Sequence, residues 1–309
     1  MKIRSKKAKG LRIKQMTMIK LIGINSLLVF LTFQTFAQEV SVNQEEKVYK
    51  NVAGRELVVD MFSTSTTLQK SANPAIALFH GGGWVSGDRK EFYEVCRRYA
   101  RKGFVTFSFQ YRLSRNEDNT YPDPDITLVE CVKDARSAIR WLRANAEELK
   151  IDLDKIVVGG QSAGGQLALS TALIDDVNEE TDNLEISPVP NALLLFSSNV
   201  NTIEAWIDMI MGDRRNEIWS ISPYHNLKPN MPPAIGFRGD VDNQVLPYTV
   251  NFFRTKMIEL GNYYDLITYK GRGHYLAEGN EKYATYFDEE ILERTDDFLV
   301  KFGFMKPGD

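Results

Sequence analysis

A serine with a glycine two positions away on each side lies near the middle of the chain, in the string G-Q-S-A-G at residues 160–164. Apolar residues precede it and small residues follow it, which predicts a strand, a sharp turn and a helix with Ser162 at the turn. Glycines at these positions let the strand and the helix pass closely without clashes between Cβ atoms. The pattern is typical of a nucleophilic serine, and it also occurs in glycine-rich turns without chemistry.

A nucleophilic serine needs a base, and the chain offers only three histidines. His80 precedes three glycines, and we expect it to hold that loop by a hydrogen bond. His225 lies ahead of a predicted strand and is interpreted as a satisfied loop residue. His274 follows the last predicted strand among small residues, so its imidazole can swing over the edge of the sheet toward Ser162. We therefore predict that His274 is the base.

The base in turn needs an acid that holds one imidazole nitrogen, fixes the tautomer and stabilises the imidazolium. The chain order serine, acid, histidine places this acid after the predicted strand at residues 233–238. Asp240 and Asp242 compete for the role. Either one is also typical of a solvated loop carboxylate, so the choice stays open at this point.

A run of three glycines, residues 81–83, follows the apolar strand predicted at residues 75–79. Without side chains, the backbone N–H groups of such a run can turn toward an anionic ligand. We expect Gly82, Gly83 and Ala163 to donate to the oxyanion of an acyl-transfer intermediate. The run lacks the spacing of dinucleotide and phosphate loops, which disfavours nucleotide binding. A flexible loop without chemistry is the alternative.

These motifs together resemble an α/β-hydrolase over residues 75–302, of the group with the oxyanion motif H-G-G-G-W. The chain is similar to acetyl esterases and hormone-sensitive-lipase-like enzymes, and more so to the small feruloyl or acetyl-xylan esterase-like branch. In this group the acid stands three residues before a valine, which favours Asp242 over Asp240 because Val245 follows at that spacing. Two departures are Gln161, where many lipase-like relatives have an acid, and Arg238, where a histidine is common.

The resemblance implies an α/β-hydrolase fold, a mostly parallel eight-stranded sheet with helices on both faces and a small cap or none. It implies acyl transfer through an acyl-enzyme on Ser162, with no metal and no cofactor. We also expect Trp84 and Gln161 to contact the substrate. The three scattered histidines and two distant cysteines fit no common metal-binding spacing.

The elements that position these residues alternate between strand and helix, which predicts a mostly parallel sheet covered on both faces. Strands are expected at residues 47–49, 56–62, 75–79, 104–109, 155–158, 191–196, 233–238 and 266–269. Helices are expected at residues 88–102, 126–149, 163–174, 247–260 and 287–302. Cys96 and Cys131 fall in helices on opposite faces of the sheet, so we predict that both are free thiols.

The first 37 residues differ in kind from the rest of the 309-residue chain. Eight cations with no acid precede an apolar run that ends at Ala37, which predicts a secretory signal peptide cleaved there and export to the periplasm or the cell exterior. An uncleaved anchor is the alternative, although the run is short for a membrane span. Residues 38–309 are then expected to form one catalytic domain.

Removing that segment makes the chain more acidic than its full net charge of −3. Of the 38 cations 30 remain against 41 acids, which gives a net charge of about −11 and disfavours nucleic acid and anionic membrane surfaces as partners. The expected partner is a small-molecule or carbohydrate ester. The oligomeric state is not readable from the sequence.

The leading functional hypothesis is a serine carboxylesterase for short acyl esters, such as acetyl or feruloyl esters of carbohydrates. The segment between residues 196 and 233, where lids insert, is short, which disfavours long-chain lipids. It holds four residues that either line a pocket or pack internally, namely Trp206, Met209, Met211 and Trp219. The alternatives are an amide hydrolase of the arylformamidase or peptidase type, and a silent hydrolase fold used for binding.

Overall fold

The computed structural model describes residues 40–276 and 288–308. Residues from Val40 onward form one compact unit. The predicted signal peptide lies outside the described residues, so its cleavage stays a prediction. No helix in the described ranges is long and apolar enough to cross a membrane.

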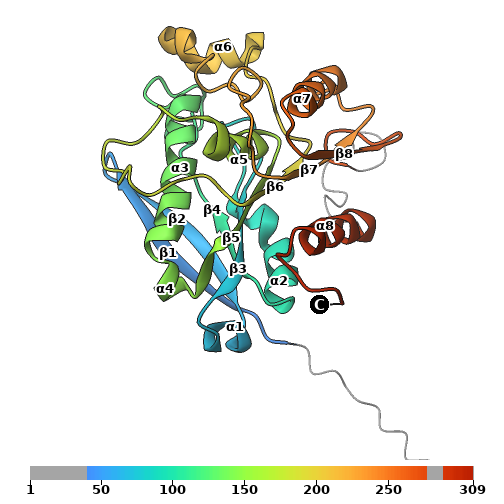
Figure 1. The fold of residues 1–309 in the computed structure, drawn as a ribbon. Helices are drawn as coiled ribbons and strands as arrows, with labels where there is room; N and C mark the ends of the chain where they lie inside the picture. Colours follow the sequence, from blue (N-terminus) through green and yellow to red (C-terminus); the bar gives the residue numbers. More distant parts are fainter. Residues whose placement is uncertain (1–39, 277–287, 309) are drawn as a thin grey trace, which may run out of the picture. The chain divides into compact units, whose positions relative to one another are not determined.

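A single eight-stranded sheet runs through this unit in the order β1-β2-β4-β3-β5-β6-β7-β8 (Figure 1). Strand β2 is antiparallel to both of its neighbours, and every other pair is parallel. The predicted mostly parallel eight-stranded sheet is therefore confirmed. The strands are β1 (Asn43–Val52), β2 (Arg55–Ser63), β3 (Asn73–Phe79), β4 (Val105–Phe109), β5 (Ile151–Gln161), β6 (Ala192–Phe196), β7 (Ala234–Gly239) and β8 (Tyr264–Tyr269).

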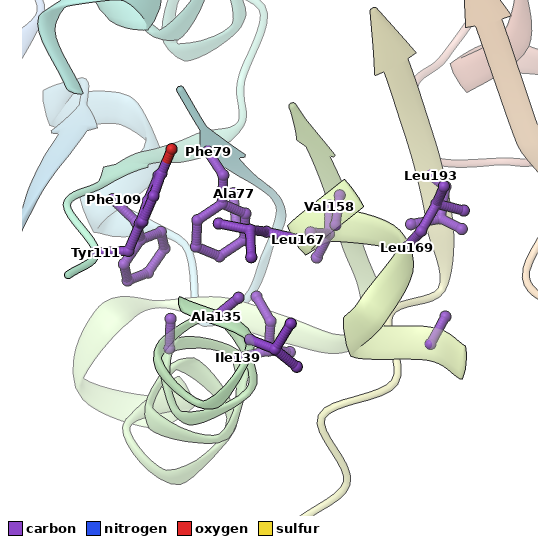
Figure 2. Close-up of a cluster of buried hydrophobic side chains, with 14 of the residues drawn as sticks. Ala77, Phe79, Phe109, Tyr111, Ala135, Ile139, Val158, Leu167, Leu169 and Leu193 are labelled. Carbon is purple, nitrogen blue, oxygen red and sulfur yellow. The ribbon is translucent and has the colours of Figure 1, made fainter. Parts of the chain in front are cut away.

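Helices cover both faces of the sheet because side chains of successive strand residues point to opposite faces. Along β5, Val158 belongs to the buried cluster under α3 and α5, whereas Val157 belongs to the cluster under α2 and α8. Figure 2 shows the first cluster, where Ile139 of α3 and Leu167 of α5 lie beside the strand residues. The helices are α1 (Ser65–Gln69), α2 (Tyr93–Arg101), α3 (Leu128–Ala144), α4 (Ala146–Leu149), α5 (Ala163–Leu173), α6 (Ala205–Met211), α7 (Pro247–Glu259) and α8 (Glu289–Lys301), with 3₁₀ turns at Arg89–Phe92 and Gly212–Glu217.

The two cysteines lie in these opposite clusters. Cys131 of α3 is in the first and Cys96 of α2 is in the second, and both are buried free thiols. The prediction of free thiols is confirmed.

The helix predicted at residues 126–149 begins two residues later and is divided at Asn145 into two helices, the second of which ends at Leu149 as predicted. The Thr127 hydroxyl and the Glu130 carboxylate form a capping box, so α3 begins at Leu128. The Asn145 side chain donates to the carbonyl of Trp141, which competes with continuation of the helix, and a separate short α4 follows.

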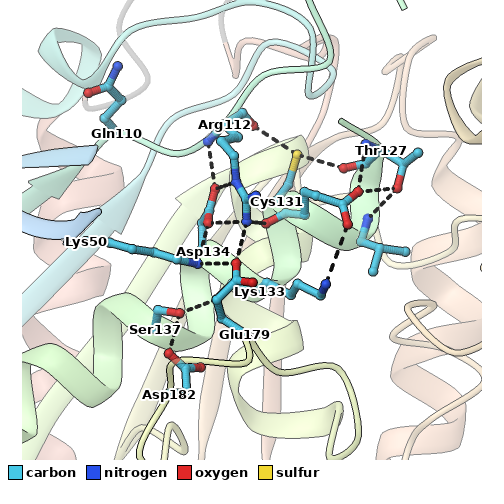
Figure 3. Close-up of polar contacts among 12 residues, drawn as sticks. Lys50, Gln110, Arg112, Thr127, Cys131, Lys133, Asp134, Ser137, Glu179 and Asp182 are labelled. Atoms are coloured by element: carbon cyan, nitrogen blue, oxygen red, sulfur yellow. Dashed lines mark hydrogen bonds and ion pairs between the residues drawn. The ribbon is translucent and has the colours of Figure 1, made fainter. Parts of the chain in front are cut away.

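A buried ion cluster ties β1 and the chain after β4 to α3 (Figure 3). The Asp134 carboxylate is fully buried and accepts two bonds from the Arg112 guanidinium, at 2.8 and 2.7 Å. Lys50 Nζ lies 2.7 Å from Asp134 Oδ1 and 2.9 Å from Glu179 Oε2. Two cations and two acids therefore neutralise each other away from water.

Removing one charge of this cluster should destabilise the fold. We predict that Asp134→Asn lowers the free energy of unfolding by about 3 kcal/mol, because Arg112 and Lys50 then remain buried with too little opposing charge. Urea unfolding measures this. Lys47→Ala is the control. Lys47 lies on the same strand as Lys50, and its ion pairs are with the exposed Glu45 and Glu148, so the change should cost less than about 1 kcal/mol. Equal effects of the two variants would contradict the prediction.

Candidate active site

The predicted functional residues follow strands in one half of the sheet, which runs in the order β3-β5-β6-β7-β8. His80 follows β3, Ser162 follows β5, Asp242 follows β7 and His274 follows β8. These strands are parallel, so their carboxyl ends meet at one edge, which is where ligands bind in sheets of this kind.

The turn at Ser162 is strained and closely packed. Its φ of 53° and ψ of −117° are unusual for a residue with a side chain, and such a conformation costs about 1–3 kcal/mol. The turn is held by a bond from the Ser162 N–H to the Phe196 carbonyl and by one from the Asn199 N–H to the Ser162 carbonyl, both 3.0 Å. A Cβ at Gly160 or Gly164 would lie within 2.4 Å of backbone atoms. The two glycines are therefore required by packing, as the motif predicted.

His274 is paired with Asp242. Its Nδ1 lies 2.9 and 3.1 Å from the two carboxylate oxygens, and both side chains are buried. The carboxylate also accepts backbone N–H bonds from Gln244 and Val245, each 2.9 Å. A carboxylate accepts only, so Nδ1 donates, and in the neutral imidazole Nε2 carries the lone pair.

Asp240 points elsewhere. It is exposed, and its carboxylate accepts the N–H of Gly271 at 2.6 Å. Of the two competing aspartates, the structure brings Asp242 to the histidine.

Gln161 contacts the other side of the imidazole. Its amide nitrogen lies 3.2 Å from His274 Nε2, and the side chain is buried. Within the described ranges, no hydrogen bond joins Ser162 Oγ to His274. The base is thus held beside the serine turn by Gln161, the residue immediately before Ser162. Bonds of this kind are often loose in a free enzyme and tighten in the substrate complex.

The glycine loop presents unpaired donors. Gly82 and Gly83 have φ of 110° and 61°, which glycine adopts without strain. Their N–H groups have no acceptor in the described part of the chain, and Ala163 lies in the first helical turn, where a helix leaves N–H groups unpaired. All three predicted donors are available to an anion.

The glycine loop is held in place by contacts with His80 and Tyr111. His80 Nδ1 bonds the Gly81 carbonyl at 2.8 Å, and the Tyr111 ring stacks on the imidazole at 4.4 Å. The Tyr111 hydroxyl donates to the His80 carbonyl at 3.0 Å. Burial lowers the pKa of His80 to about 4, so it is neutral at neutral pH. The predicted structural role of His80 is confirmed, and sequence reasoning missed Tyr111.

Trp84 lies inside the protein. It is 1% exposed, and its indole N–H donates to Gln166 of α5 at 3.1 Å. Gln166 in turn donates to the Ile221 carbonyl at 2.9 Å. Trp84 therefore fastens the glycine loop to α5, and its expected contact with substrate stays a prediction.

Trp206 of α6 lies over the glycine loop. It stacks on Trp84 at 5.4 Å, and its ring lies 3.7 Å from the position of a Cβ at Gly83. It is 40% exposed, which leaves part of the ring open to a ligand. Of the other residues in this segment, Met211 is buried, whereas Met209 and Trp219 are exposed.

The remaining polar residues considered from the sequence have ordinary partners. His225 Nδ1 lies 2.8 Å from the Ser222 hydroxyl, as expected for a satisfied loop residue. Among the described residues, no group of three or more His, Cys, Asp or Glu side chains is arranged to hold a metal ion.

Comparison with known proteins identifies the family. Residues 59–257 match the family model described as BD-FAE. The chain belongs to the BD-FAE family. Esterase 2 of Thermogutta terrifontis is 32% identical to this BD-FAE member, with a TM-score of 0.76 over 86% of this chain and 94% of that one. The resemblance to serine esterases of the α/β-hydrolase fold is therefore confirmed.

Two curated relatives match shorter regions. An arylesterase of Saccharolobus solfataricus is 30% identical over 55% of this chain and 56% of its own length. Lipase 2 of a Moraxella species is 33% identical over 43% of this chain and 30% of its own length. The matched region thus spans about a third to just over half of these two proteins.

The low pKa of His80 predicts a loss of stability in acid. Burial lowers this pKa from the usual 6.5 to about 4, so the unfolded chain binds more protons between these values and stability falls as the pH drops. Between pH 7 and pH 5 the residue should account for about 2 kcal/mol of lost stability.

Urea unfolding of the wild type and of His80→Gln at both pH values tests this. The variant, which cannot titrate there, should lose less stability than the wild type by that amount. His225 is present in both proteins, so its contribution cancels. An equal loss in the two proteins would refute the prediction.

Proposed function

We propose that this protein is a carboxylesterase that hydrolyses short acyl esters through an acyl-enzyme on Ser162. The observation that carries the proposal is the buried Asp242–His274 pair beside the strained turn at Ser162. The unpaired N–H groups of the glycine loop and of α5 belong to segments at the same edge of the sheet, and they support it.

In the first half-reaction, Ser162 Oγ attacks the ester carbonyl carbon while its proton passes to Nε2 of His274. Asp242 stabilises the resulting imidazolium. The carbonyl oxygen becomes an oxyanion that accepts bonds from the three unpaired N–H groups, each worth about 3–4 kcal/mol of transition-state stabilisation. The intermediate then expels the alcohol, which takes the proton from His274.

In the second half-reaction, water replaces the alcohol. It gives a proton to His274 and attacks the acyl-serine carbonyl, and collapse of the intermediate releases the acid and returns the proton to Ser162. The same residues therefore serve both steps.

Two findings support short acyl groups. Esterase 2 of Thermogutta terrifontis has been solved with propionate and with butyrate bound, and also as phosphorylated by paraoxon. In this chain the Trp206 ring lies next to Gly83 and narrows the space beside the proposed oxyanion site. Acetyl or feruloyl esters of carbohydrates fit the resemblance, and we propose that the protein meets them outside the cytoplasm, based on residues 1–37.

The proposal is tested by turnover of 4-nitrophenyl acetate, butyrate and decanoate by the wild type and by Ser162→Ala. The wild type should prefer acetate and butyrate, and the variant should lose at least about 10³-fold in kcat because the nucleophile is gone. A folded wild type that does not hydrolyse these esters but cleaves an N-formyl aniline would instead establish an amide hydrolase. A folded wild type with neither activity would favour a binding role.

The two aspartates provide a matched pair of variants. Asp242→Asn should lower kcat by about 10⁴-fold, since the imidazole loses the partner that fixes its tautomer. Asp240→Asn should stay within a few-fold of the wild type, because that carboxylate contacts Gly271 and not His274. A reversed order of effects on ester turnover would assign the acid to Asp240.

A further inference from the structure

The Gln161 side chain has a place in the site that the reaction above does not explain. It is the last residue of β5 and is only 3% exposed. Its amide nitrogen lies 3.2 Å from Nε2 of His274, the atom that must accept the serine proton. A buried amide at that atom must affect the base, because its N–H occupies the lone pair that would accept the serine proton.

The other end of the amide explains the first glycine of the loop. A Cβ at Gly81 would lie 1.8 Å from Gln161 Oε1. Gly81 does not have a positive φ, so its backbone conformation does not require glycine. A side chain at position 81 would instead displace the Gln161 amide from the space that it fills. One amide thus connects the glycine loop to the imidazole.

The orientation of this amide follows from its two neighbours. Asp242 accepts from Nδ1, so in the neutral imidazole Nε2 carries no proton and accepts from a donor. The Gln161 NH₂ group can supply one, and this leaves Oε1 against Gly81. Gln161 therefore selects the tautomer in which Nε2 is ready to act as a base.

We propose that Gln161 is a positioning residue, which docks the neutral His274 imidazole between turnovers and links it to the oxyanion loop. This inference rests on the proposed function. On substrate binding, Nε2 exchanges the Gln161 N–H for the Ser162 O–H. The imidazolium formed in the reaction has no lone pair for Gln161, so the amide contact re-forms only after the proton has left Nε2.

Several other titratable groups lie on the elements around His274. They are Asp242 and Asp240 on the loop after β7, Arg238 at the end of β7, Arg272 and Tyr275 on the loop of His274, Asp288 before α8 and His80 after β3. Arg272 is paired with Asp288, and His80 is neutral near pH 7. Among the residues that the structure describes, Asp242 is thus the anion in contact with the ring, and a carboxylate at position 161 would be a second one.

The test compares the pH dependence of kcat/KM for 4-nitrophenyl acetate in three variants with the wild type. Gln161→Glu should move the acid limb to higher pH by about one unit, because a carboxylate favours the imidazolium. Gln161→Met should move it in the same direction by less, since it only removes the donor to the neutral ring. Asn243→Asp is the matched control, because it adds the same charge next to Asp242 on an exposed residue, and it should leave the limb in place.

A second measurement does not depend on turnover. The chain has only three histidines, so NMR can follow the protonation of each imidazole, with His274→Gln assigning the signal. The His274 titration midpoint should rise in Gln161→Glu by the same amount as the acid limb.

Variants of Gln161 that lower kcat without moving either the acid limb or the NMR midpoint would show a purely structural role and overturn the inference. If Gln161→Glu does not fold, Gln161→Met decides by the same two measurements. Ester turnover that survives Ser162→Ala would refute the proposed function instead, while a shifted NMR midpoint would still support the contact between Gln161 and His274.

Discussion

The rest of the site depends on the close contact between the first turn of α5 and the end of β3. A Cβ at Gly164 would lie 2.0 Å from the Phe79 carbonyl oxygen and 2.4 Å from that of His80. Only a glycine lets these two backbones meet, and their meeting brings the serine turn beside the glycine loop. The position of the nucleophile relative to the proposed oxyanion donors is thus set by backbone packing, which side-chain motion cannot loosen.

The parallel sheet beneath this contact between α5 and β3 holds the other residues of the candidate site in fixed positions. Gln161 and His274 lie 113 positions apart in the chain, and they meet because β5 and β8 belong to one parallel array. The Asp242–His274 pair is buried at its edge, where an unpaired carboxylate would be unfavourable. Two backbone N–H bonds hold that carboxylate in place, so the loop after β7 orients the acid through contacts that do not involve the histidine.

The sequence predicted those parts of the site that depend on local chemistry. Ser162 was identified because glycine spacing and an apolar run define its turn, and the strands were found as unbroken apolar segments. Tyr111 and the Gln161–His274 contact were missed, because each joins segments far apart in the chain and leaves no periodic or spacing signal. Trp84 was expected at the substrate because of its motif, but its motif does not reveal that the side chain is buried and bonded to Gln166 of α5.

The energies of the two alternative contacts of His274 explain why an occupied base is compatible with turnover. The Gln161 bond to the imidazole is a buried neutral bond, with a net worth of about 1 kcal/mol. Each oxyanion bond contributes about 3–4 kcal/mol, and it does so only as charge develops in the transition state. Exchange of the Gln161 contact for the Ser162 hydroxyl therefore costs little compared with what the transition state gains. The resting contact can keep the imidazole in the correct tautomer without holding it back from the reaction.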